Sequence, residues 1–360
     1  MSDFDNPASD DVPGRWDVDR AWAWYRRLPW IVGCNFIPST ASNQLEMWQA
    51  ETFDPGTIDR ELGLAQGLGF NTVRVYLHDL LWQRDADGFM GRVDHFLGLA
   101  ASHDIRAIVV FFDGVWNNRA YAGPQADPIP GVHNSRWVQS PTSPEVVDPT
   151  AWPRLRDYVQ GVLRRLTDDE RILMWDLYNE PGNEGLLGNA LPLLREVMTW
   201  AREIDPSQPL SVGPWNWSED FTDLNRFQVD NSDIITFHSY EDVATVERLL
   251  REHQRPGRPV ICTEYLARTT ESHFESHLPL FREAGVGCIN WGLVAGKTQT
   301  HFPWGSTQGA SEPAVWYHDI FRPDGTPYDE AEVRFIRRVI SESTAAPAGS
   351  EFRGRAEDRR

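Results

Sequence analysis

Short apolar runs of strand length recur along the chain, and turn residues and then a stretch of helical periodicity follow each run. Most runs are β-branched and nearly continuous in apolar character, which is typical of strands covered on both faces. Eight such runs are present, at residues 30–36, 72–76, 105–112, 171–178, 209–213, 233–238, 259–265 and 286–292. Their alternation with helical stretches predicts repeated βα units around a parallel sheet.

Amphipathic stretches between these runs predict the helices. They cover residues 57–68, 91–102, 152–166, 191–203, 219–227, 243–253, 273–284 and 330–340, and the one at 219–227 is short and weakly patterned. Asp54-Pro55 and Asp148-Pro149 precede the first and third helices. Each pair places a short polar residue and a proline where an N-terminal helical turn favours them, so we expect helix starts there.

Eight alternating units favour an α/β fold in the form of a single (β/α)8 TIM barrel over a doubly wound sheet, which commonly has fewer strands. Long polar segments at 114–148 and 294–315 predict long βα loops after strands 3 and 8. We expect the catalytic barrel to span residues 21–342. Residues 1–20 are expected to form a mobile acidic extension, and residues 343–360 a disordered tail.

The charge balance narrows the choice of partners. The chain has 34 Lys and Arg against 53 Asp and Glu, a formal net charge of −19. Such an acidic protein repels phosphate backbones and anionic membrane surfaces, so neither nucleic acid nor a membrane is an expected partner. The sequence has no signal peptide pattern and no membrane-spanning apolar stretch, which predicts a cytoplasmic protein. The oligomeric state is left open.

Three cysteines, Cys34, Cys262 and Cys288, lie in or beside apolar runs. An odd number cannot pair completely, and the positions fit reduced core thiols in a reducing compartment. A catalytic cysteine with a histidine partner is the alternative. Buried free cysteine usually behaves as a small hydrophobic residue, so we favour the structural interpretation.

Polar and aromatic side chains gather at the predicted strand ends. In a barrel, the carboxyl ends of the strands carry the active site. The candidates there are Asn35 and Phe36; Arg74, Tyr76 and His78; Phe112 and Asp113; Asn179 and Glu180; His238 and Tyr240; Glu264; and Trp291. This set suits glycoside hydrolysis, in which one carboxylate attacks the anomeric carbon and a second protonates the leaving oxygen.

Glutamates at the ends of strands four and seven can face one another across the barrel mouth. Arg74, with Tyr265 or Tyr240, is placed to keep a nucleophilic carboxylate ionised, whereas the acid needs surroundings that raise its pKa. Tryptophan rings stack on the apolar faces of sugars, which accounts for the sixteen tryptophans of the chain. The sequence therefore predicts a carbohydrate substrate.

The ordered set of strand ends resembles the clan A glycoside hydrolases, most closely a glycoside hydrolase family 5, cellulase-like barrel. The residues that carry this resemblance, spread over about residues 30–340, are Asn179-Glu180-Pro181, Glu264 in CTEY, Arg74 in NTVRVY, His238-Ser239-Tyr240 and Trp291. The resemblance implies a retaining β-glycosidase without metal or other cofactor.

The resemblance also implies roles for individual residues. Glu180 falls on the acid/base position and Glu264 on the nucleophile position, and Asn179 is expected to bind the sugar 2-hydroxyl. The family's substrate-binding positions fall on Arg74, His238, Tyr240 and Trp291. Two further strand-end residues, Asn35 and Asp113, join the substrate-binding candidates.

The long loops add further candidates for substrate binding. Trp116, Trp137 and Trp304 are the tryptophans that we favour as sugar platforms, because they lie in these loops. His133 and Asn134 are placed to contact sugar hydroxyls, with a solvated loop as the alternative. Glu46, near the first strand, either holds a terminal sugar or caps a helix.

Structural interpretations compete with these roles. Glu180 alone would fit a turn-capping carboxylate, and Glu264 an ion pair with Arg74. His238 and Tyr240 would also fit hydrogen-bonded packing groups beneath a site. The position of both glutamates in one ordered set favours catalysis.

Two functional alternatives of another class remain. A metal site built from His78-Asp79, His133 and His238 lacks the His-x-His that hydrolytic metal barrels usually show on the first strand. A catalytically silent sugar-binding barrel would use the same cleft and aromatic residues. Such a binder has no need of two facing glutamates, so we favour the hydrolase.

Overall fold

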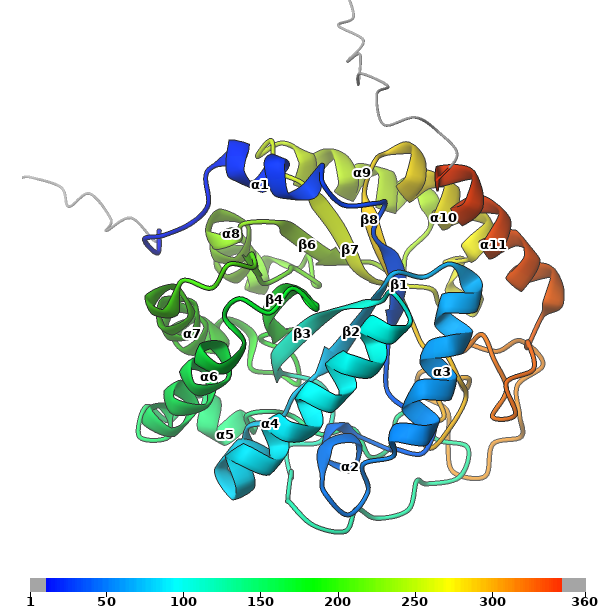
Figure 1. The fold of residues 1–360 in the computed structure, drawn as a ribbon, viewed down its shortest axis with the longest axis horizontal. Helices are drawn as coiled ribbons and strands as arrows, with labels where there is room; N and C mark the ends of the chain where they lie inside the picture. Colours follow the sequence, from blue (N-terminus) through cyan, green and yellow to red (C-terminus); the bar gives the residue numbers. More distant parts are fainter. Residues whose placement is uncertain (1–10, 345–360) are drawn as a thin grey trace, which may run out of the picture.

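The computed structural model describes residues 11–344, in which eight parallel strands are surrounded by helices (Figure 1). Strand β1 lies between β2 and β8, and the others follow in chain order on either side. The strands are β1 Val32–Asn35, β2 Thr72–Tyr76, β3 Arg106–Asp113, β4 Ile172–Asn179, β5 Leu210–Ser211, β6 Ile235–His238, β7 Val260–Tyr265 and β8 Gly287–Trp291. The predicted (β/α)8 barrel is confirmed, and every predicted apolar run overlaps one of these strands.

The barrel closes between β5 and β6 with few ladder hydrogen bonds. Strand β5 has only two residues, because the prolines at 209 and 214 bracket this segment and offer no N–H group. The backbone N–H of Asp233 donates to the Leu210 carbonyl at 2.9 Å, and the Ser211 hydroxyl donates to the Ile234 carbonyl at 2.7 Å. A side-chain hydroxyl thus contributes to closure where the ladder is short.

Helices cover the outside of the sheet. The α-helices are α1 Val18–Tyr25, α2 Gln44–Trp48, α3 Pro55–Leu68, α4 Asp79–Ser102, α5 Ser143–Val146, α6 Trp152–Leu166, α7 Leu191–Ile204, α8 Thr222–Asn231, α9 Val243–Gln254, α10 Phe274–Glu283 and α11 Glu330–Thr344. Short 3₁₀ helices are η1 Leu187–Ala190, η2 Glu219–Phe221 and η3 Arg268–Thr270. Each predicted helix overlaps one of these elements; α1, α2 and α5 were not predicted.

The two predicted helix starts have different outcomes. Asp54 is the N-cap of α3, and its carboxylate accepts from the backbone N–H of Thr57 at 3.0 Å, as predicted. The start at Asp148 is wrong, because α6 begins at Trp152. Asp148 instead accepts from the N–H of Thr150 at 3.0 Å, so its side chain closes a local turn before the helix.

The N-terminal end of the barrel is plugged by the segment that leads into α1. Trp16 is 4% exposed and packs with Trp24, Ile108 and Ile261. The backbone N–H of Trp16 donates to Asp233 at 2.7 Å. The expected boundary at residue 21 therefore falls inside α1, and residues 11–20 belong to the barrel because Trp16 buries its apolar surface there. Residues 1–10 and 345–360 lie outside the described part of the chain.

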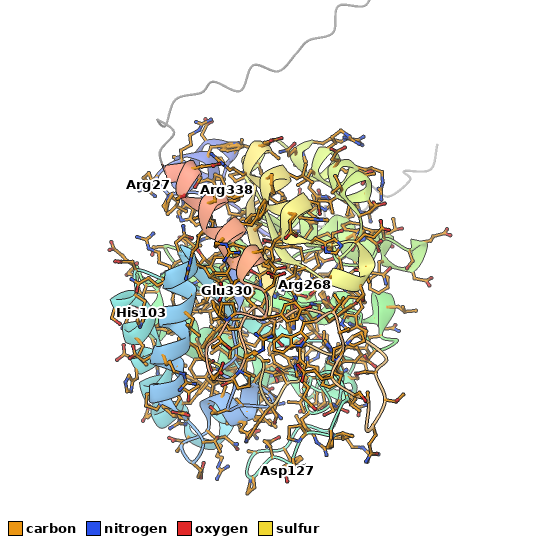
Figure 2. All side chains as sticks on the ribbon, turned by 90° about the vertical axis from the view of Figure 1, so that its right-hand side faces the viewer. Arg27, His103, Asp127, Arg268, Glu330 and Arg338 are labelled. Carbon is orange, nitrogen blue, oxygen red and sulfur yellow. The ribbon has the colours of Figure 1, made fainter. Side chains whose placement is uncertain are left out.

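Different segments cover the two ends of the barrel: α1 covers one end, and the long loops after β3 and β8 cover the other. Helix α1 lies at the top of Figure 1, and the loops after β3 and β8 extend toward the bottom. Figure 2 likewise places Arg27, just after α1, and Asp127, in the loop after β3, at opposite ends of the molecule. The β8 loop runs from residue 292 to 329, longer than predicted. No helix among the described residues is long and apolar enough to cross a membrane.

Candidate active site

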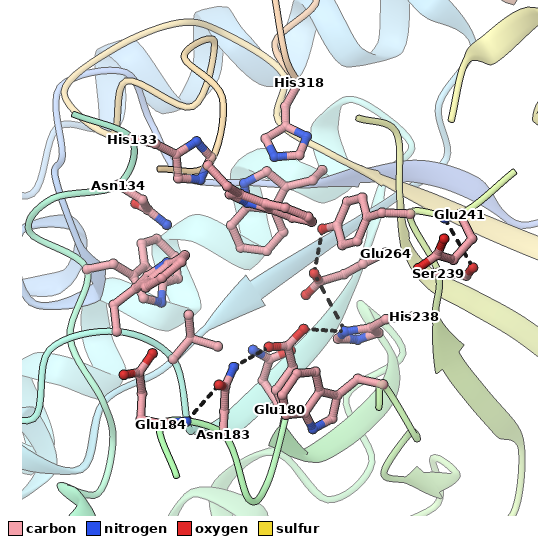
Figure 3. A pocket seen from close by; sticks show the side chains of 18 of the residues that line it. His133, Asn134, Glu180, Asn183, Glu184, His238, Ser239, Glu241, Glu264 and His318 are labelled. Atoms are coloured by element: carbon pink, nitrogen blue, oxygen red, sulfur yellow. Dashed lines mark hydrogen bonds and ion pairs between the residues drawn. The ribbon is translucent and has the colours of Figure 1, made fainter. Parts of the chain in front are cut away.

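A pocket of about 380 Å³ opens among the carboxyl ends of the strands (Figure 3). It is lined by eleven of the fifteen residues given a catalytic or substrate-binding role from the sequence: Asn179, Glu180, His238, Tyr240, Glu264, Trp291, Trp116, His133, Asn134, Trp137 and Trp304. Four predicted residues lie outside its lining: Arg74, Asn35, Asp113 and Glu46. The fold therefore collects most of the predicted site from four strand ends, those of β4, β6, β7 and β8, and from the loops after β3 and β8.

Glu264, at the end of β7, is held by donors on both carboxylate oxygens. The Arg74 guanidinium and the Tyr76 hydroxyl donate to Oε1 at 2.8 and 2.9 Å, and the Tyr240 hydroxyl donates to Oε2 at 2.7 Å. Donors of this kind favour the ionised form of a carboxylate. Of the two tyrosines weighed from the sequence, Tyr240 makes this contact, whereas the ring of Tyr265 packs against residues of α10.

Arg74 lies beneath the pocket as a fully buried cation. Its guanidinium also bonds Asp176 at 2.8 Å and the side-chain oxygen of Asn179 at 2.7 Å. Burial alone would lower the pKa of Arg74, but Tyr76 and the carboxylates of Asp176 and Glu264 raise it above its usual value. The guanidinium thus stays charged and orients the groups around it.

Glu180, which follows β4, has a different environment. Its side chain is 13% exposed, and it meets His238 Nδ1 at 3.0 Å and the side-chain amide of Asn183 at 2.7 Å. Burial raises the pKa of Glu180; the hydrogen bond from His238 opposes this and the charge of Glu264 adds to it. A carboxyl group with a raised pKa keeps its proton to higher pH, as a general acid requires.

The backbone of Glu180 is in the left-handed region, with a φ of +48°. That conformation costs a residue with a Cβ about 1–2 kcal/mol and is found where surrounding structure enforces it, often at functional sites. Gly114 of the β3 loop lies against this turn, and a Cβ there would come within 2.6 Å of the Glu180 carbonyl oxygen. Close backbone packing therefore helps to hold Glu180 in the pocket.

The two glutamates approach one another closely. One oxygen of Glu180 and one of Glu264 lie within 4.8 Å of each other, and His238 Nδ1 lies 3.6 Å from Glu264 Oε2. A carboxylate separation of about 5–5.5 Å is typical of retaining glycosidases, whereas inverting enzymes need about 6.5–9.5 Å for a water molecule. The geometry matches the retaining arrangement.

Residues 39–296 match the family Cellulase (glycosyl hydrolase family 5). The chain belongs to glycoside hydrolase family 5. It is therefore a glycoside hydrolase, of a clan whose members retain the anomeric configuration. No curated protein matches this family 5 enzyme.

Solved structures of family 5 proteins share the fold. An exo-β-1,4-mannosidase from Opitutaceae bacterium strain TAV5 is 19% identical at a TM-score of 0.59; the match covers 87% of this chain and 60% of that one. A GH5 subfamily 18 protein from Streptomyces cattleya, in complex with Manβ1-4GlcNAc, is 15% identical at 0.61, covering 90% and 83%. The endo-β-1,4-mannanase from Thermotoga petrophila is 14% identical at 0.58, covering 91% and 78%.

A second layer of side chains supports the pocket of this family 5 enzyme. The side-chain amide of Asn179 donates one hydrogen bond to Asp113 at 3.0 Å, and its oxygen accepts one from Arg74. Asp113 is 1% exposed and also accepts from the indole N–H of Trp137 at 2.6 Å. Burial raises the pKa of Asp113 to about 7, and these donors oppose the shift. Asn35, also buried, accepts from Arg74 at 2.8 Å. Asp113 and Asn35 are thus placed to orient the residues that line the pocket.

Glu46 lies away from the pocket lining. Its carboxylate accepts from the backbone N–H of Ser42 at 2.8 Å and pairs with Lys297 at 2.5 Å. Asn43 caps helix α2, in which Glu46 occupies the third position. The sequence left two roles open for Glu46, sugar binding and helix capping. Its position at the start of α2 favours helix capping.

Aromatic residues form much of the pocket surface. Trp137 is buried at 2% exposure, whereas Trp116 and Trp304 are 39% and 43% exposed and lie at the rim. Trp215 and Trp217, after β5, also line the pocket and were not among the favoured platforms. Among the other tryptophans, Trp48 belongs to the core and Trp82 packs on Tyr158 outside the barrel.

Several residues in or beneath the pocket had no assigned role from the sequence. Tyr76 lies two residues after Arg74 on β2, so both side chains project to the same face, and that periodicity was the available signal. Asn183 and Glu184 follow the turn at Pro181, and Glu241 follows Tyr240. His318 enters from the long β8 loop, where no local pattern marks it.

The alternative chemistries weighed from the sequence have weak structural support. His78 is the N-cap of α4, where Nδ1 bonds the N–H of Leu80 at 3.2 Å, so it does not join His133 and His238 in the pocket. Glu180, His238 and Glu264 are the one cluster among the described residues with metal-ligand spacing, and hydrogen bonds already account for it. The three cysteines are buried, and burial raises their thiol pKa values, which disfavours a thiolate nucleophile.

Proposed function

We propose that this enzyme is a retaining β-glycosidase with Glu264 as nucleophile and Glu180 as acid/base. The observation that carries the proposal is the contrast between two neighbouring carboxylates. Glu264 receives three donors, including the cation of Arg74, whereas burial raises the pKa of Glu180. Two titratable groups whose environments differ in this way divide the nucleophile and acid roles between them.

The reaction then proceeds by double displacement. Glu264 attacks the anomeric carbon and forms a glycosyl ester while Glu180 gives its proton to the departing glycosidic oxygen. Glu180 next takes a proton from water, which attacks the anomeric carbon and releases Glu264. His238, at 3.0 Å from Glu180, orients this carboxyl group in both protonation states. Asn179 retains a second amide hydrogen for the sugar 2-hydroxyl, since Asp113 takes only one.

An uncharged β-linked glycoside is the proposed substrate. Four glutamates line the pocket, and its described lining includes no lysine or arginine, so uronic acids and sulfated sugars would be repelled. The structural neighbours named as mannosidase and mannanase make β-1,4-mannosides the first substrates to test. A cytoplasmic address remains a prediction, and it would favour short glycosides over insoluble polymers.

A mechanism-based inhibitor tests the proposal directly. Activated 2-deoxy-2-fluoro β-glycosides of mannose, glucose, galactose and xylose would be incubated with the enzyme, and the labelled peptide identified by mass spectrometry. We expect one sugar to label Glu264, and the variant Glu264→Gln to remain unlabelled. Carbohydrate binding without labelling, and without hydrolysis of any aryl β-glycoside, would support the silent sugar-binding barrel instead.

A further inference from the structure

The pocket ends at a wall built from the two long loops, residues 114–142 after β3 and residues 292–329 after β8. The backbone N–H of Asn134 donates to the Thr298 carbonyl at 2.7 Å, and that of Gly131 donates to the side chain of Gln299 at 2.8 Å. A Cβ on Gly131 would come within 2.7 Å of a backbone nitrogen in the β8 loop. The two loops therefore touch backbone to backbone.

The segment after β1, residues 36–46, supports this wall from outside the pocket lining. The backbone N–H of Lys297 donates to the Ser39 carbonyl at 3.0 Å, and its ammonium group pairs with Glu46 at 2.5 Å. A Cβ on Gly296 would lie 2.3 Å from the Ser39 carbonyl oxygen, so these loops also meet without a gap for a side chain. The β8 loop is thus held by the β3 loop on one side and by the segment after β1 on the other.

Burial differs between the base of the wall and the rest of the pocket mouth. At the base of the wall, Asn134 is 3% exposed and His318 is 1% exposed, whereas Trp116 and Trp304 at its rim are 39% and 43% exposed. Across the pocket from them lie Glu180 and Asn183 (Figure 3), and on the side of the β5 loop Trp217 is 38% exposed. The pocket is therefore closed at the base of the wall, where Asn134 and His318 lie, and accessible at its rim and on the side of the acid/base candidate.

The wall presents hydrogen-bond acceptors to the pocket. His133 Nδ1 contacts the Phe302 carbonyl at 2.7 Å and His318 Nδ1 contacts the Leu266 carbonyl; a carbonyl only accepts, so each Nδ1 carries the hydrogen. Burial lowers the pKa of His133 to about 4 and that of His318 well below its usual value, so both rings are neutral and each Nε2 is an acceptor.

Asn134 adds an acceptor that the protein leaves unused. Its side-chain Oδ1 is buried and has no hydrogen-bond partner within the described residues, and its backbone φ is +50°. A buried polar atom without a partner costs about 1–3 kcal/mol, which a ligand can recover. A strained, buried and unsatisfied residue in the lining of a pocket indicates a ligand contact.

We propose that this wall, through Asn134, His133 and His318, binds the hydroxyls of one terminal sugar and makes the enzyme exo-acting. The inference rests on the proposed function, because it places the attacked sugar between Glu264 and the wall. Sugar hydroxyls supply the donors that the three acceptors lack. The leaving group extends past Glu180 to the exposed side, and a chain continuing beyond the terminal sugar would collide with the wall.

Product analysis tests the direction of cleavage. β-1,4-linked manno- and cellotetraose, each labelled at the reducing end with 2-aminobenzamide, would be digested briefly and separated by chromatography. We expect labelled trisaccharide and free monosaccharide as the first products. Labelled mono- or disaccharide as a first product would overturn exo action while leaving hydrolysis intact. Absence of hydrolysis of these substrates and of all aryl β-glycosides would remove the proposed function, and this inference with it.

A substitution tests the recognition itself. Asn134→Gly removes the amide and tolerates the positive φ, so folding should be preserved. The aryl monoglycoside hydrolysed fastest would be compared with its 3-, 4- and 6-deoxy forms. We expect the wild type to lose about 10-fold in kcat/KM on at least one deoxy form, and Asn134→Gly to show no such penalty at that position.

The matched control is Tyr121→Ala, since Tyr121 lies in the same loop, is 49% exposed and is outside the pocket lining. It should keep both the activity and the deoxy penalties. If Asn134→Gly retains every penalty of the wild type, the assignment of Asn134 to sugar recognition is wrong.

Discussion

The Tyr240 hydroxyl donates a hydrogen bond of 2.7 Å to Glu264 Oε2, across two neighbouring strand ends. The opposite oxygen, Oε1, is occupied by Arg74 and Tyr76. Tyr240 is thus the donor on the oxygen that Arg74 does not hold. Removing the Tyr240 hydroxyl therefore measures how much this one hydrogen bond to Glu264 contributes to catalysis.

Tyr240→Phe is expected to lower kcat/KM by about 10–100-fold, because a hydrogen bond to a charged group is worth about 1.5–3 kcal/mol. Steady-state kinetics on an aryl β-glycoside measures this loss. Tyr265→Phe is the matched control: Tyr265 adjoins Glu264 in sequence, but its ring packs against Phe274 and Phe281. An equal loss in both variants would point to a general packing effect and contradict the prediction.

Glu180→Ala is expected to separate substrates by their leaving groups. Hydrolysis of an aryl glycoside with a poor leaving group should fall by about 10²–10⁴-fold, because it needs the proton that Glu180 supplies. A dinitrophenyl glycoside needs no such proton, so its first step should be retained and azide should restore turnover as a β-glycosyl azide. Formation of an α-azide, or equal losses for both substrates, would refute an acid/base role for Glu180.

His238→Ala is expected to move the basic limb of the pH profile to higher pH. The hydrogen bond from His238 lowers the pKa of Glu180, so its removal raises that pKa further. Because the acid works only when protonated, activity should persist to higher pH, even though its maximum falls. The measurement is kcat/KM against pH, with His103→Ala at the opposite end of the barrel as control. A basic limb that stays in place would show that His238 does not set the protonation of Glu180.

Asp319→Asn is expected to stabilise the protein increasingly as pH rises. Asp319 is 1% exposed, and burial raises its pKa from 3.8 to about 7. Because the pKa of Asp319 is higher in the folded than in the unfolded protein, its protonated side chain contributes fully to the free energy of unfolding below about pH 4. That contribution is lost as the pH rises toward 7. In this window the wild type should lose about 1.4 kcal/mol per pH unit relative to the variant.

Urea unfolding at pH 4.5, 6 and 7.5 measures this difference. Asp127→Asn, at an exposed position in the β3 loop, should show no growth of the difference with pH. A constant difference between Asp319→Asn and the wild type across the three pH values would contradict the raised pKa.

Most of the fold could be predicted from local sequence patterns. Apolar runs and helical periodicity located all eight strands, and Asp54-Pro55 marked a helix start correctly, because these signals depend on neighbouring residues. Asp148-Pro149 misled because the same residue types also close turns. The burial of Trp16 could not be predicted, because the residues around it in the sequence are acidic and polar. Its ring is buried against residues far away in the sequence, at the N-terminal end of the barrel.

The sequence by itself determined the barrel, its strand ends and therefore the approach of Glu180 and Glu264, because parallel strands in chain order must deliver their carboxyl ends to one rim. Only the tertiary structure decided that Tyr240 rather than Tyr265 bonds Glu264, and that Glu46 lies beside a helix start. It also joined the β3 and β8 loops into a wall that includes His318. Contacts between segments 160 residues or more apart leave no local pattern, since they depend on how the closed barrel brings the loops together.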